Sequence, residues 1–529
     1  MTNSIEEFEK SDLILITGSN TSEMHPVLSS FMKRGIRNGK TKLIVVDPRD
    51  IKMVDHADIW LRQKPGSDVA WLNGMIHVII NEELYDKKYV AERTENFEEL
   101  KKITATYTPE RVEAISGIPK DRLVEAARMY AEAPAASIAY AMGITQHING
   151  TDAVKSVANL AMLCGNVGIE AGGVNPLRGQ NNVQGACDMG GLPNVFSGYQ
   201  PVDSLDASKK MAQAWGVSTL PDKKGLTIVE IVNAASHGDM KGLYIMGENP
   251  MLSDPDLNHV EEGFGKLDFL VVQDIFLTET AQKADVVLPA ASFAEKDGTF
   301  TNTERRVQRV RKAVEPPGSA RDDWEIICGI SDKMGVPMPY ASVSDIFDEL
   351  ASVTPSYAGI TYDRIEVEGI QWPCPDQNHP GTRFLHKDKF VRGKGMFHGI
   401  EWTPPAESPD KDYPYLLTTG RVLYHYHTGT MTHRSGGFDE LYGECLAEVN
   451  DVDAEKLKIK DGDMIRVASR RGEIQVKASV SGATDQGVIF IPFHFSDPAV
   501  NKLINSSDLD PIAKIPEYKV CPVSMEKVA

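Results

Sequence analysis

A glycine- and amide-rich segment, residues 164–191, has the clearest potential for chemistry in this sequence. It reads CGNVGIEAGGVNPLRGQNNVQGACDMGG and places one cation, Arg178, close to Gln180 and three further amide side chains. The planar guanidinium group of arginine matches the two oxygens of a small carboxylate, which favours a site for a small anionic substrate. The segment has neither a helical nor a strand period, and we expect an irregular loop. A surface loop whose arginine pairs with a neighbouring acid would give the same sequence pattern.

Three histidines follow a second arginine in the string GRVLYHYHTGTMTHR. If the chain is extended there, His425 and His427 share a face, and with His433 they could imitate a histidine metal site. No carboxylate nearby completes a recognised ligand pattern, so we favour hydrogen-bonding roles. The six cysteines form no CxxC pair, which indicates isolated thiols and neither a disulfide framework nor an iron–sulfur or zinc site.

One strand–helix–strand pattern occurs twice in the chain. Each copy has an apolar run that ends in a polar turn, then a helix-length segment, a second apolar run and a similar third run. The runs fall at residues 13–16, 43–46 and 56–61 in the first copy, and at residues 243–246, 269–272 and 283–288 in the second. Short apolar runs separated in this way predict parallel strands joined by right-handed crossovers.

The polar turns after these runs would lie at the carboxyl edge of each sheet, where ligands of such folds bind. A glycine there allows close approach to a phosphate, and a carboxylate can accept hydrogen bonds from ribose or guanine. Two such edges indicate binding sites for two nucleotide ends. Tight turns of a doubly wound fold that bind no ligand would give the same sequence pattern. Neither turn contains GxGxxG, which weakens the alternative of a nicotinamide-dependent dehydrogenase.

Length, charge and hydropathy narrow the class of protein. The 529 residues correspond to roughly three to four domains of ordinary size. A net charge of −19 argues against nucleic acid as a partner. No apolar run approaches the length of about 18 residues that a membrane helix requires, and the acidic N-terminal sequence does not resemble an export signal. We therefore expect a soluble, cytoplasmic protein without a membrane span.

The C-terminal part of the sequence has a different pattern of apolar and polar residues. After the proline-rich residues 402–414, alternating segments at 464–468 and 474–478 are separated by turn residues. This pattern predicts a separate β-barrel domain.

Several longer strings resemble one family. They are ITGSNTSEMHP, VVDPRD, LRQKPGSD, YAMGITQH, NPLRGQNNVQGACDMGGLPNVFSGYQ, IMGENPMLSD, FAEKDGTFTNTERRVQRV, TTGRVLYHYHTGTMTHR and IPEYKVCPV. They are similar to the catalytic subunit of formate dehydrogenases, within the molybdopterin oxidoreductase family, from residue 1 to the end. The resemblance implies an α/β fold with two doubly wound αβα domains and a C-terminal β-barrel of the double-psi type. The expected domains are 1–180 and 181–400, both αβα and cofactor-binding, the second without its N-terminal part, and 401–529, the dinucleotide-binding barrel.

The resemblance also implies a cofactor and a set of site residues. The cofactor is a bis-molybdopterin guanine dinucleotide that holds molybdenum or tungsten. Arg178 matches the arginine that orients formate in the family, with Gln180 beside it as a second catalytic residue. The residues that correspond to the cofactor cradle are Gly18, Ser19, Asn20, Asp47, Pro48, Arg49, Gly66, Asp68, Gly143, Gln146, His147, Gly247, Glu248, Asn249, Gln273, Asp274, Thr278, Arg421, His425, Tyr518 and Lys519.

Two features of the family have no match in this sequence. They are the selenocysteine or cysteine that ligates the metal and the domain that carries a [4Fe-4S] cluster. We expect both upstream of Met1, in a missing N-terminal segment or in a separate polypeptide. Residues 180–390 should then show an unpaired strand edge or an exposed apolar face.

The expected partners are formate or CO2 and an electron-transfer subunit linked to ferredoxin, a hydrogenase or a flavin. Two alternatives stay open at this point. One is a related molybdopterin oxidoreductase that acts on nitrate, and the other is a nucleotide-binding module without catalysis.

Overall fold

The computed structural model describes residues 1–528 and divides the chain into two units. The first unit comprises Met1–Leu177 and Phe384–Ala529, and the second comprises Arg178–Arg383. The division into three domains that the sequence suggested stays a prediction. No helix among the described residues is both long and apolar enough to cross a membrane.

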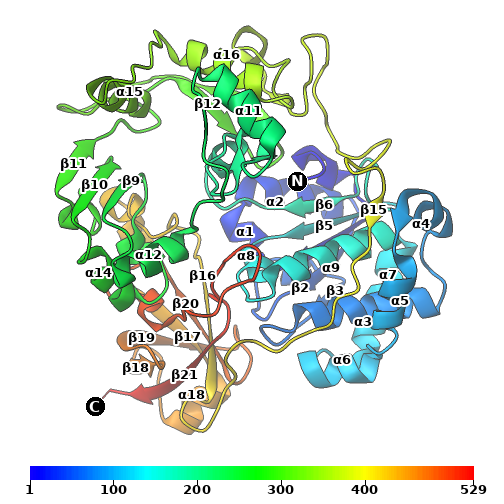
Figure 1. Ribbon diagram of the computed structural model, residues 1–529. Helices are drawn as coiled ribbons and strands as arrows, with labels where there is room; N and C mark the ends of the chain where they lie inside the picture. Colours follow the sequence, from blue (N-terminus) through cyan, green and yellow to red (C-terminus); the bar gives the residue numbers. More distant parts are fainter. Residues whose placement is uncertain (529) are drawn as a thin grey trace. The chain divides into compact units, whose positions relative to one another are not determined.

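The first unit contains a five-stranded parallel sheet with the order β3-β2-β1-β5-β6 (Figure 1). Its strands are β1 (Leu13–Thr17), β2 (Lys42–Val46), β3 (Ile59–Leu61), β5 (Ala136–Tyr140) and β6 (Val174–Pro176). Every residue of β1 and β5 is buried. Strands that are covered on both faces read as continuous apolar runs, which explains why no polar alternation occurs at residues 13–16.

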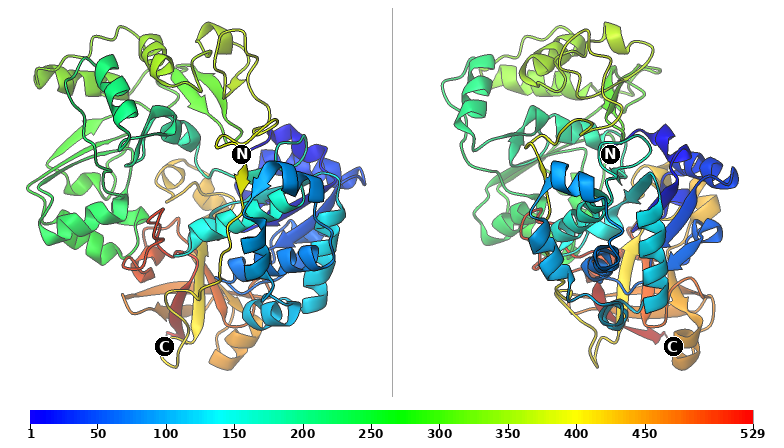
Figure 2. Two further views of the ribbon diagram at one scale, coloured as in Figure 1. Left: turned by 45° about the vertical axis from the view of Figure 1, so that its right-hand side comes forward. Right: turned by 90° about the vertical axis from the view of Figure 1, so that its right-hand side faces the viewer.

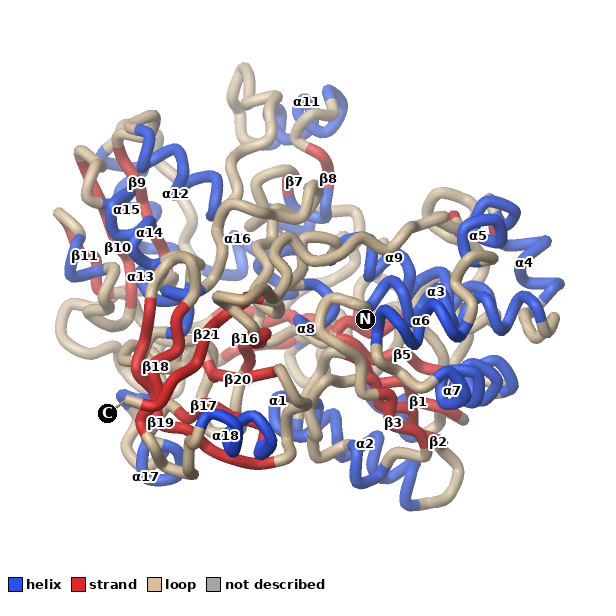
Figure 3. The backbone as a smooth tube through the Cα atoms, turned by 90° about the horizontal axis from the view of Figure 1, so that it is seen from below, coloured by secondary structure: helices blue, strands red, loops and turns tan. Residues whose placement is uncertain are grey.

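Helices cover both faces of this sheet (Figure 3). One face packs against α3 (Asp68–Asn81), α7 (Lys120–Glu132) and α9 (Gly150–Leu163). The other packs against α2 (Pro26–Arg37) and the 3-10 helix Ile5–Glu9. The remaining short elements are α1 (Thr21–Met24), α4 (Lys87–Arg93), α5 (Phe97–Thr104), α6 (Pro109–Ser116), α8 (Met142–Thr145) and the strand pair β4 (Thr94–Glu95) and β15 (Gly395–Met396).

The second unit repeats the first three strands of this arrangement. Its parallel sheet has the order β11-β10-β9, formed by β9 (Gly242–Met246), β10 (Phe269–Asp274) and β11 (Val286–Pro289). In both units the third strand of the copy lies beside the second, and the second beside the first. The repeat predicted from the sequence is therefore confirmed in strand position, direction and order.

One face of the second sheet is covered, and the other is exposed over part of its area. Helices α12 (Ile228–His237) and α14 (Leu257–Phe264) pack on the first face. On the opposite face Tyr244, Met246 and Phe269 are 42%, 47% and 50% exposed. The exposed apolar face that the sequence predicted for this region is present.

The rest of the second unit is built from short elements. They are β7 (Val195–Phe196), β8 (Gln200–Pro201), an antiparallel sheet of β12 (Gly298–Thr301), β13 (Arg306–Val310) and β14 (Ile370–Gln371), and the helices α10 (Val183–Asp188), α11 (Leu205–Ala214), α13 (Pro250–Ser253), α15 (Asp323–Lys333) and α16 (Val343–Val353). Residues 164–191 were expected to be wholly irregular, and this is wrong in part because they include β6 and α10. Elements of three and six residues are too short to show a period in the sequence.

The C-terminal part of the first unit, drawn in yellow to red in Figure 2, is a barrel. The barrel is closed, and its strand order is β16-β20-β17-β19-β18-β21. Its elements are β16 (Tyr415–Gly420), β17 (Leu446–Asn450), β18 (Met464–Ala468), β19 (Glu473–Ser481), β20 (Val488–Pro492), β21 (Cys521–Lys527), α17 (Phe438–Tyr442) and α18 (Asp451–Leu457). The strands expected at 464–468 and 474–478 are confirmed as β18 and the first part of β19. Closure leaves the barrel without an unpaired edge.

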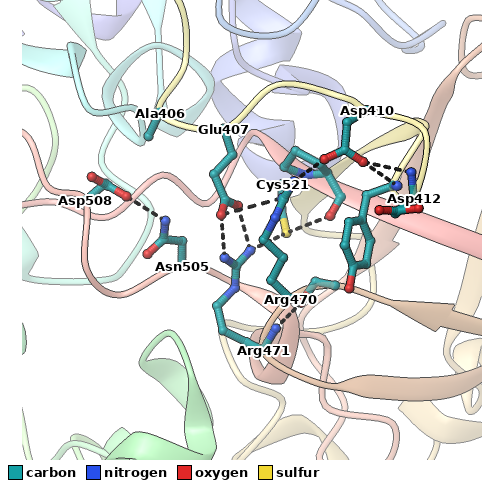
Figure 4. A network of polar contacts seen from close by, with 12 residues as sticks. Ala406, Glu407, Asp410, Asp412, Arg470, Arg471, Asn505, Asp508 and Cys521 are labelled. Carbon is teal, nitrogen blue, oxygen red and sulfur yellow. Dashed lines mark hydrogen bonds and ion pairs between the residues drawn. The ribbon is translucent and has the colours of Figure 1, made fainter.

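Ion pairs attach residues 402–414 to the barrel (Figure 4). Glu407 accepts hydrogen bonds from both terminal nitrogens of Arg471 at 2.8 Å, and Asp410 pairs with Arg470 at 2.6 Å. Arg471 also lies 3.3 Å from the sulfur of Cys521. The Arg471–Glu407 pair is largely shielded from water and bidentate, so it holds this connection more firmly than an ordinary surface pair. Cys521 and the other five cysteines are free, as predicted.

Candidate functional site

The polar turn after β1 lies at the carboxyl edge of the first sheet, as expected. Gly18 has a left-handed backbone with φ of +56°, and its N–H donates to the carbonyl of Val46 at 3.3 Å. The hydroxyls of Ser19 and Thr21 lie 3.1 Å apart, and the side-chain oxygen of Asn20 is buried without a hydrogen-bond partner. The turn thus offers buried polar groups next to a backbone that can approach a ligand closely.

The turn after β2 joins the first sheet to the barrel. Arg49 binds Glu448 on β17 through two hydrogen bonds of 2.6 and 3.1 Å, and its guanidinium lies 3.5 Å from the ring centroid of Phe490 on β20. The backbone N–H of Arg49 also donates to Asp47 Oδ1 at 3.0 Å. Asp47 is therefore fixed at the strand end, with Pro48 between it and the residue that reaches the barrel.

Charged groups lie close together at this edge, where Asp47 is buried and Lys519 and Arg421 are half-buried. Burial raises the pKa of Asp47 to about 6, although the N–H and the charge of Arg49 oppose the shift. Burial and the charge of Arg421 lower the pKa of Lys519 to about 7, and Asp47 opposes that shift. The ammonium group of Lys519 donates to the carbonyl of Thr419 at 2.6 Å, and Thr419 Oγ1 donates to the carbonyl of Tyr518 at 2.9 Å. Arg421 and Lys519 bring two half-buried cations close together, which suits an anionic ligand.

His147 lies between two carboxylates that come from distant parts of the chain. Its Nε2 donates to the carbonyl of Gly143 at 2.9 Å and lies 3.7 Å from Asp68 Oδ2. Its Nδ1 lies 3.5 Å from Glu517 Oε1, and Glu517 also accepts from the N–H of Ala406 at 3.1 Å. Burial alone would lower the pKa of His147, but the nearby carboxylates of Glu517 and Asp68 outweigh burial and raise the pKa above its ordinary value of 6.5. Glu517 was not singled out in the sequence, although it directly precedes Tyr518.

The histidines of residues 425–433 do not lie on an extended strand. The chain turns after β16, and the rings of His425 and His433 approach to 4.2 Å between centroids. His425 donates from Nε2 to the carbonyl of Tyr442 at 2.5 Å, and its Nδ1 lies 3.0 Å from the hydroxyl of Thr432. The condition under which His425 and His427 would share a face, an extended chain, is therefore not met. The turns of this segment depend on contacts with distant residues that short-range sequence patterns do not show.

A carboxylate does approach these histidines, although the sequence showed none that would complete a metal-ligand pattern. Asp439 lies 2.6 Å from Nδ1 of His433, and together with His425 these residues place three potential metal ligands within 4.8 Å of one another. Each ring nitrogen of His425 already has a hydrogen-bond partner, and Nε2 of His433 lies 3.1 Å from the carbonyl of His494. These contacts favour the hydrogen-bonding roles over metal ligation.

The corresponding edge of the second sheet carries the second group of predicted residues. Gly247 follows β9 with φ of +65°, and a Cβ there would meet nothing within 4 Å. The side-chain oxygen of Asn249 accepts from the N–H and the hydroxyl of Thr280 at 3.2 and 2.7 Å. Asp274 Oδ1 accepts from the N–H groups of the next two residues at 2.6 and 3.2 Å. The edge is open at the glycine and held in shape by these side-chain bonds.

Three further predicted residues lie at this edge. Burial raises the pKa of Glu248, with a contribution from the charge of Asp274. The amide nitrogen of Gln273 donates to Asp323 at 2.6 Å, and the hydroxyl of Thr278 accepts from the N–H of Ala281 at 3.2 Å. Gln273 is completely buried, so its amide is fixed at the strand end.

Arg178 begins the second unit, next to α10. Its N–H donates to the hydroxyl of Thr303 at 3.1 Å, and its Nε donates to Gln184 Oε1 at 3.1 Å. Gln180 lies in the turn before α10, where its carbonyl accepts from the N–H of Val183 at 3.5 Å. Among the amides noted in the sequence, Gln184 thus supplies a direct contact to the guanidinium group.

The predicted residues fall into two groups, one in each unit. The first unit holds Gly18, Ser19, Asn20, Asp47, Pro48, Arg49, Gly66, Asp68, Gly143, Gln146, His147, Arg421, His425, Tyr518 and Lys519, and the second holds Arg178, Gln180, Gly247, Glu248, Asn249, Gln273, Asp274 and Thr278. Gly66 is tightly packed: its carbonyl accepts from Trp402 at 2.9 Å, and a Cβ would lie 2.6 Å from Pro405.

Comparison with known proteins identifies the family. Residues 1–333 match the molybdopterin oxidoreductase family, and residues 415–522 match the molybdopterin dinucleotide binding domain. The chain belongs to the molybdopterin oxidoreductase family. This oxidoreductase is 53% identical to the F420-dependent formate dehydrogenase subunit alpha of Methanocaldococcus jannaschii, over all of this chain and 78% of that protein. It is 43% identical to formate dehydrogenase H of Escherichia coli, over all of this chain and 74% of that protein.

A solved structure supports the fold alone. Acetylene hydratase from Pelobacter acetylenicus has a TM-score of 0.78 and 20% sequence identity to this oxidoreductase, with coverage of 99% of this chain and 81% of that one. At this identity the likeness concerns the α/β architecture and leaves the reaction open.

Membership of the family gives this oxidoreductase a bis-molybdopterin guanine dinucleotide cofactor with molybdenum or tungsten. The residues at the edge of the first sheet fit such a group. Lys519 and Arg421 are half-buried cations, and Asn20 has a buried oxygen without a hydrogen-bond partner. Phosphate oxygens accept hydrogen bonds from cations, and a guanine nucleotide offers donors to a carbonyl oxygen.

Proposed function

We propose that this chain is the substrate- and cofactor-binding part of a formate dehydrogenase, which interconverts formate and CO2 in a two-electron reaction. The observation that carries the proposal is Arg178, an arginine in an amide-rich segment whose Nε is held by Gln184. A guanidinium group can grip both oxygens of formate in one plane. In this role Arg178 binds the substrate and directs its C–H bond.

The two strand-end groups would hold the two halves of the cofactor. In the first unit the half-buried cations Arg421 and Lys519 offset phosphate charge, and the turns at Gly18 and Asp47 contact the nucleotide. In the second unit the turns at Gly247 and Asp274 serve the other half. The repeat of the strand order supports this assignment, because equivalent edges of equivalent sheets bind equivalent ligands.

The chemistry of formate oxidation assigns different roles to the side chains and to the cofactor. No side chain can store the electron pair of a C–H bond, and the bound metal cofactor supplies that capacity. The residues of this chain bind and orient the substrate and enclose the cofactor. His147, flanked by Asp68 and Glu517, holds a proton within the cradle.

A partner subunit would carry the electrons onward. The similar protein of Methanocaldococcus jannaschii is named as F420-dependent and as a subunit, so we propose a partner that passes electrons to F420. Formate-dependent reduction of F420 by the assembled complex tests this part of the proposal. Reduction of an artificial dye without reduction of F420 would point to a different acceptor.

The experiment that tests the main proposal compares wild-type and Arg178→Lys holoenzyme with formate and with nitrate. Lysine keeps the charge but loses the planar fork, so kcat/KM for formate should fall by about 100-fold, or about 2.7 kcal/mol of transition-state stabilisation. Arg128→Lys is a matched control on an exposed pair with Glu82 and should leave kcat/KM unchanged. Turnover of nitrate in place of formate would replace the proposal with the nitrate-type alternative.

A further inference from the structure

Asp188 is a buried carboxylate four residues after Gln184 on α10. The residue is 1% exposed and accepts four hydrogen bonds. Its Oδ1 accepts from the amide nitrogen of Gln184 and from the hydroxyl of Tyr199, both at 2.8 Å. Its Oδ2 accepts from the hydroxyl of Tyr357 at 2.6 Å and from the indole N–H of Trp372 at 2.7 Å. All four donors are uncharged, so the carboxylate is held by directed hydrogen bonds.

These bonds decide which way the side chain of Gln184 points. An ionised carboxylate can only accept, so the amide nitrogen of Gln184 must face Asp188. The amide oxygen is thereby turned to the other side, where it accepts from Nε of Arg178 at 3.1 Å. If the amide were rotated by half a turn, its N–H groups would face the N–H of Arg178 and the bond would be lost.

Tyr199 supports the same orientation from a strained backbone. Its φ is +59°, a conformation that bulky side chains rarely adopt. Its hydroxyl donates to Asp188 and accepts from the amide nitrogen of Gln184 at 2.9 Å. Such strain persists where the surrounding contacts determine the position of the residue, and it is common near functional sites.

We propose that Asp188 is a positioning residue of the substrate site: it fixes the orientation of Gln184 and, through it, the plane of the Arg178 guanidinium. The inference rests on the proposed function, in which Arg178 orients formate. Asp188 acts through two intervening side chains and does not contact the substrate.

The variant Asp188→Asn separates this role from a general structural one. The indole of Trp372 can only donate, so the single oxygen of asparagine should turn toward it. The asparagine NH2 then faces Gln184, whose amide flips to offer its oxygen. This places the amide nitrogen of Gln184 against Nε of Arg178, and Nε loses Gln184 as an acceptor.

A second substitution should reverse this effect. In Asp188→Asn combined with Trp372→Phe, the donor that captures the asparagine oxygen is gone. Asparagine can then turn its oxygen to Gln184 and its NH2 to the hydroxyl of Tyr357, which is able to accept. Gln184 regains its original orientation. If Asp188 had only a general structural role, the double variant would be more impaired than the single one, because it loses more packing.

The test measures KM and kcat for formate and the metal content of each holoenzyme. We expect Asp188→Asn to raise KM about tenfold at unchanged metal content, the equivalent of about 1.4 kcal/mol in binding, and the double variant to return to within about threefold of wild type. Asp453→Asn is the matched control, a buried aspartate in the first unit that accepts from the N–H of Gly487, and KM should not change.

The outcomes are distinct from those of the main proposal. An unchanged KM in Asp188→Asn, or a double variant worse than the single one, overturns the inference while Arg178→Lys still impairs turnover. If Asp188→Asn does not fold, Gln184→Met decides, because it removes the acceptor at nearly constant volume: a raised KM supports the inference and an unchanged KM overturns it. Failure of the proposed function itself would appear in the wild-type enzyme, as absence of formate turnover.

Discussion

The backbones of Gly18 and Gly143 touch. A Cβ on Gly143 would lie 2.4 Å from the Cα of Gly18, and one on Gly18 would lie 2.7 Å from the carbonyl carbon of Gly143. The N–H of Gly143 donates to the carbonyl of Gly18 at 3.0 Å. This contact fixes the turn after β1 against α8, from which Gln146 and His147 continue into the cradle.

Gly143→Ala should therefore disturb both folding and cofactor retention. The added methyl group would meet backbone atoms that cannot move aside, and such overpacking costs about 1–3 kcal/mol. We expect a lower unfolding temperature and loss of guanine nucleotide from the purified holoenzyme. Gly329→Ala is the control, since that helical glycine has open space around its Cβ position and alanine favours helix. Equal behaviour of the two variants would contradict the packing argument.

The buried His147 should make stability depend on pH with a defined sign. Its pKa is raised above 6.5 in the folded state, because the nearby carboxylates of Glu517 and Asp68 outweigh burial. The protonated ring thus contributes stability that is complete below pH 6.5 and is lost as pH rises through the folded-state pKa.

The variant His147→Gln tests this dependence. Its deficit in unfolding temperature relative to wild type should be largest near or below pH 6.5 and should shrink at higher pH. His237→Gln, on an exposed residue, controls for the loss of a histidine as such. A deficit that grows with rising pH would show that the ring is neutral in the folded protein.

The exposed face of the second sheet should make the isolated chain prone to self-association. Tyr244, Met246 and Phe269 present apolar side chains on one side of β9 and β10, and exposed sheet surfaces of this kind recruit other chains. We expect the isolated chain to bind a hydrophobic fluorescent dye and to scatter light on concentration, and Phe269→Lys to reduce both. Val391→Lys, at a residue that is 96% exposed and lies in the first unit, should change neither signal.

Much of the fold could be predicted because its signals are local. The apolar runs at residues 13–16 and 243–246 became the first strands of two sheets with the same strand order, since short continuous apolar segments favour parallel strands; β1 is fully buried, whereas β9 is covered on one face only. The alternation at residues 464–468 and 474–478 identified barrel strands in the same way.

Parts of the site depend on long-range contacts and could not be predicted. Asp188 is held by Tyr357 and Trp372, which lie 169 and 184 residues away in the sequence, and only the folded chain brings them together. His433 pairs with Asp439 six residues away, and its Nε2 lies 3.1 Å from the carbonyl of His494, which is 61 residues away, so the extended arrangement considered for the histidines does not form. Glu517 would have been recognisable only through its approach to His147.

The most direct test of the account is the rate of formate oxidation by the holoenzyme as a function of its content of molybdenum or tungsten. We predict dye reduction that requires formate, that rises in proportion to metal content and that releases one CO2 for every two electrons transferred. A fully metal-loaded holoenzyme that leaves formate unoxidised would contradict it.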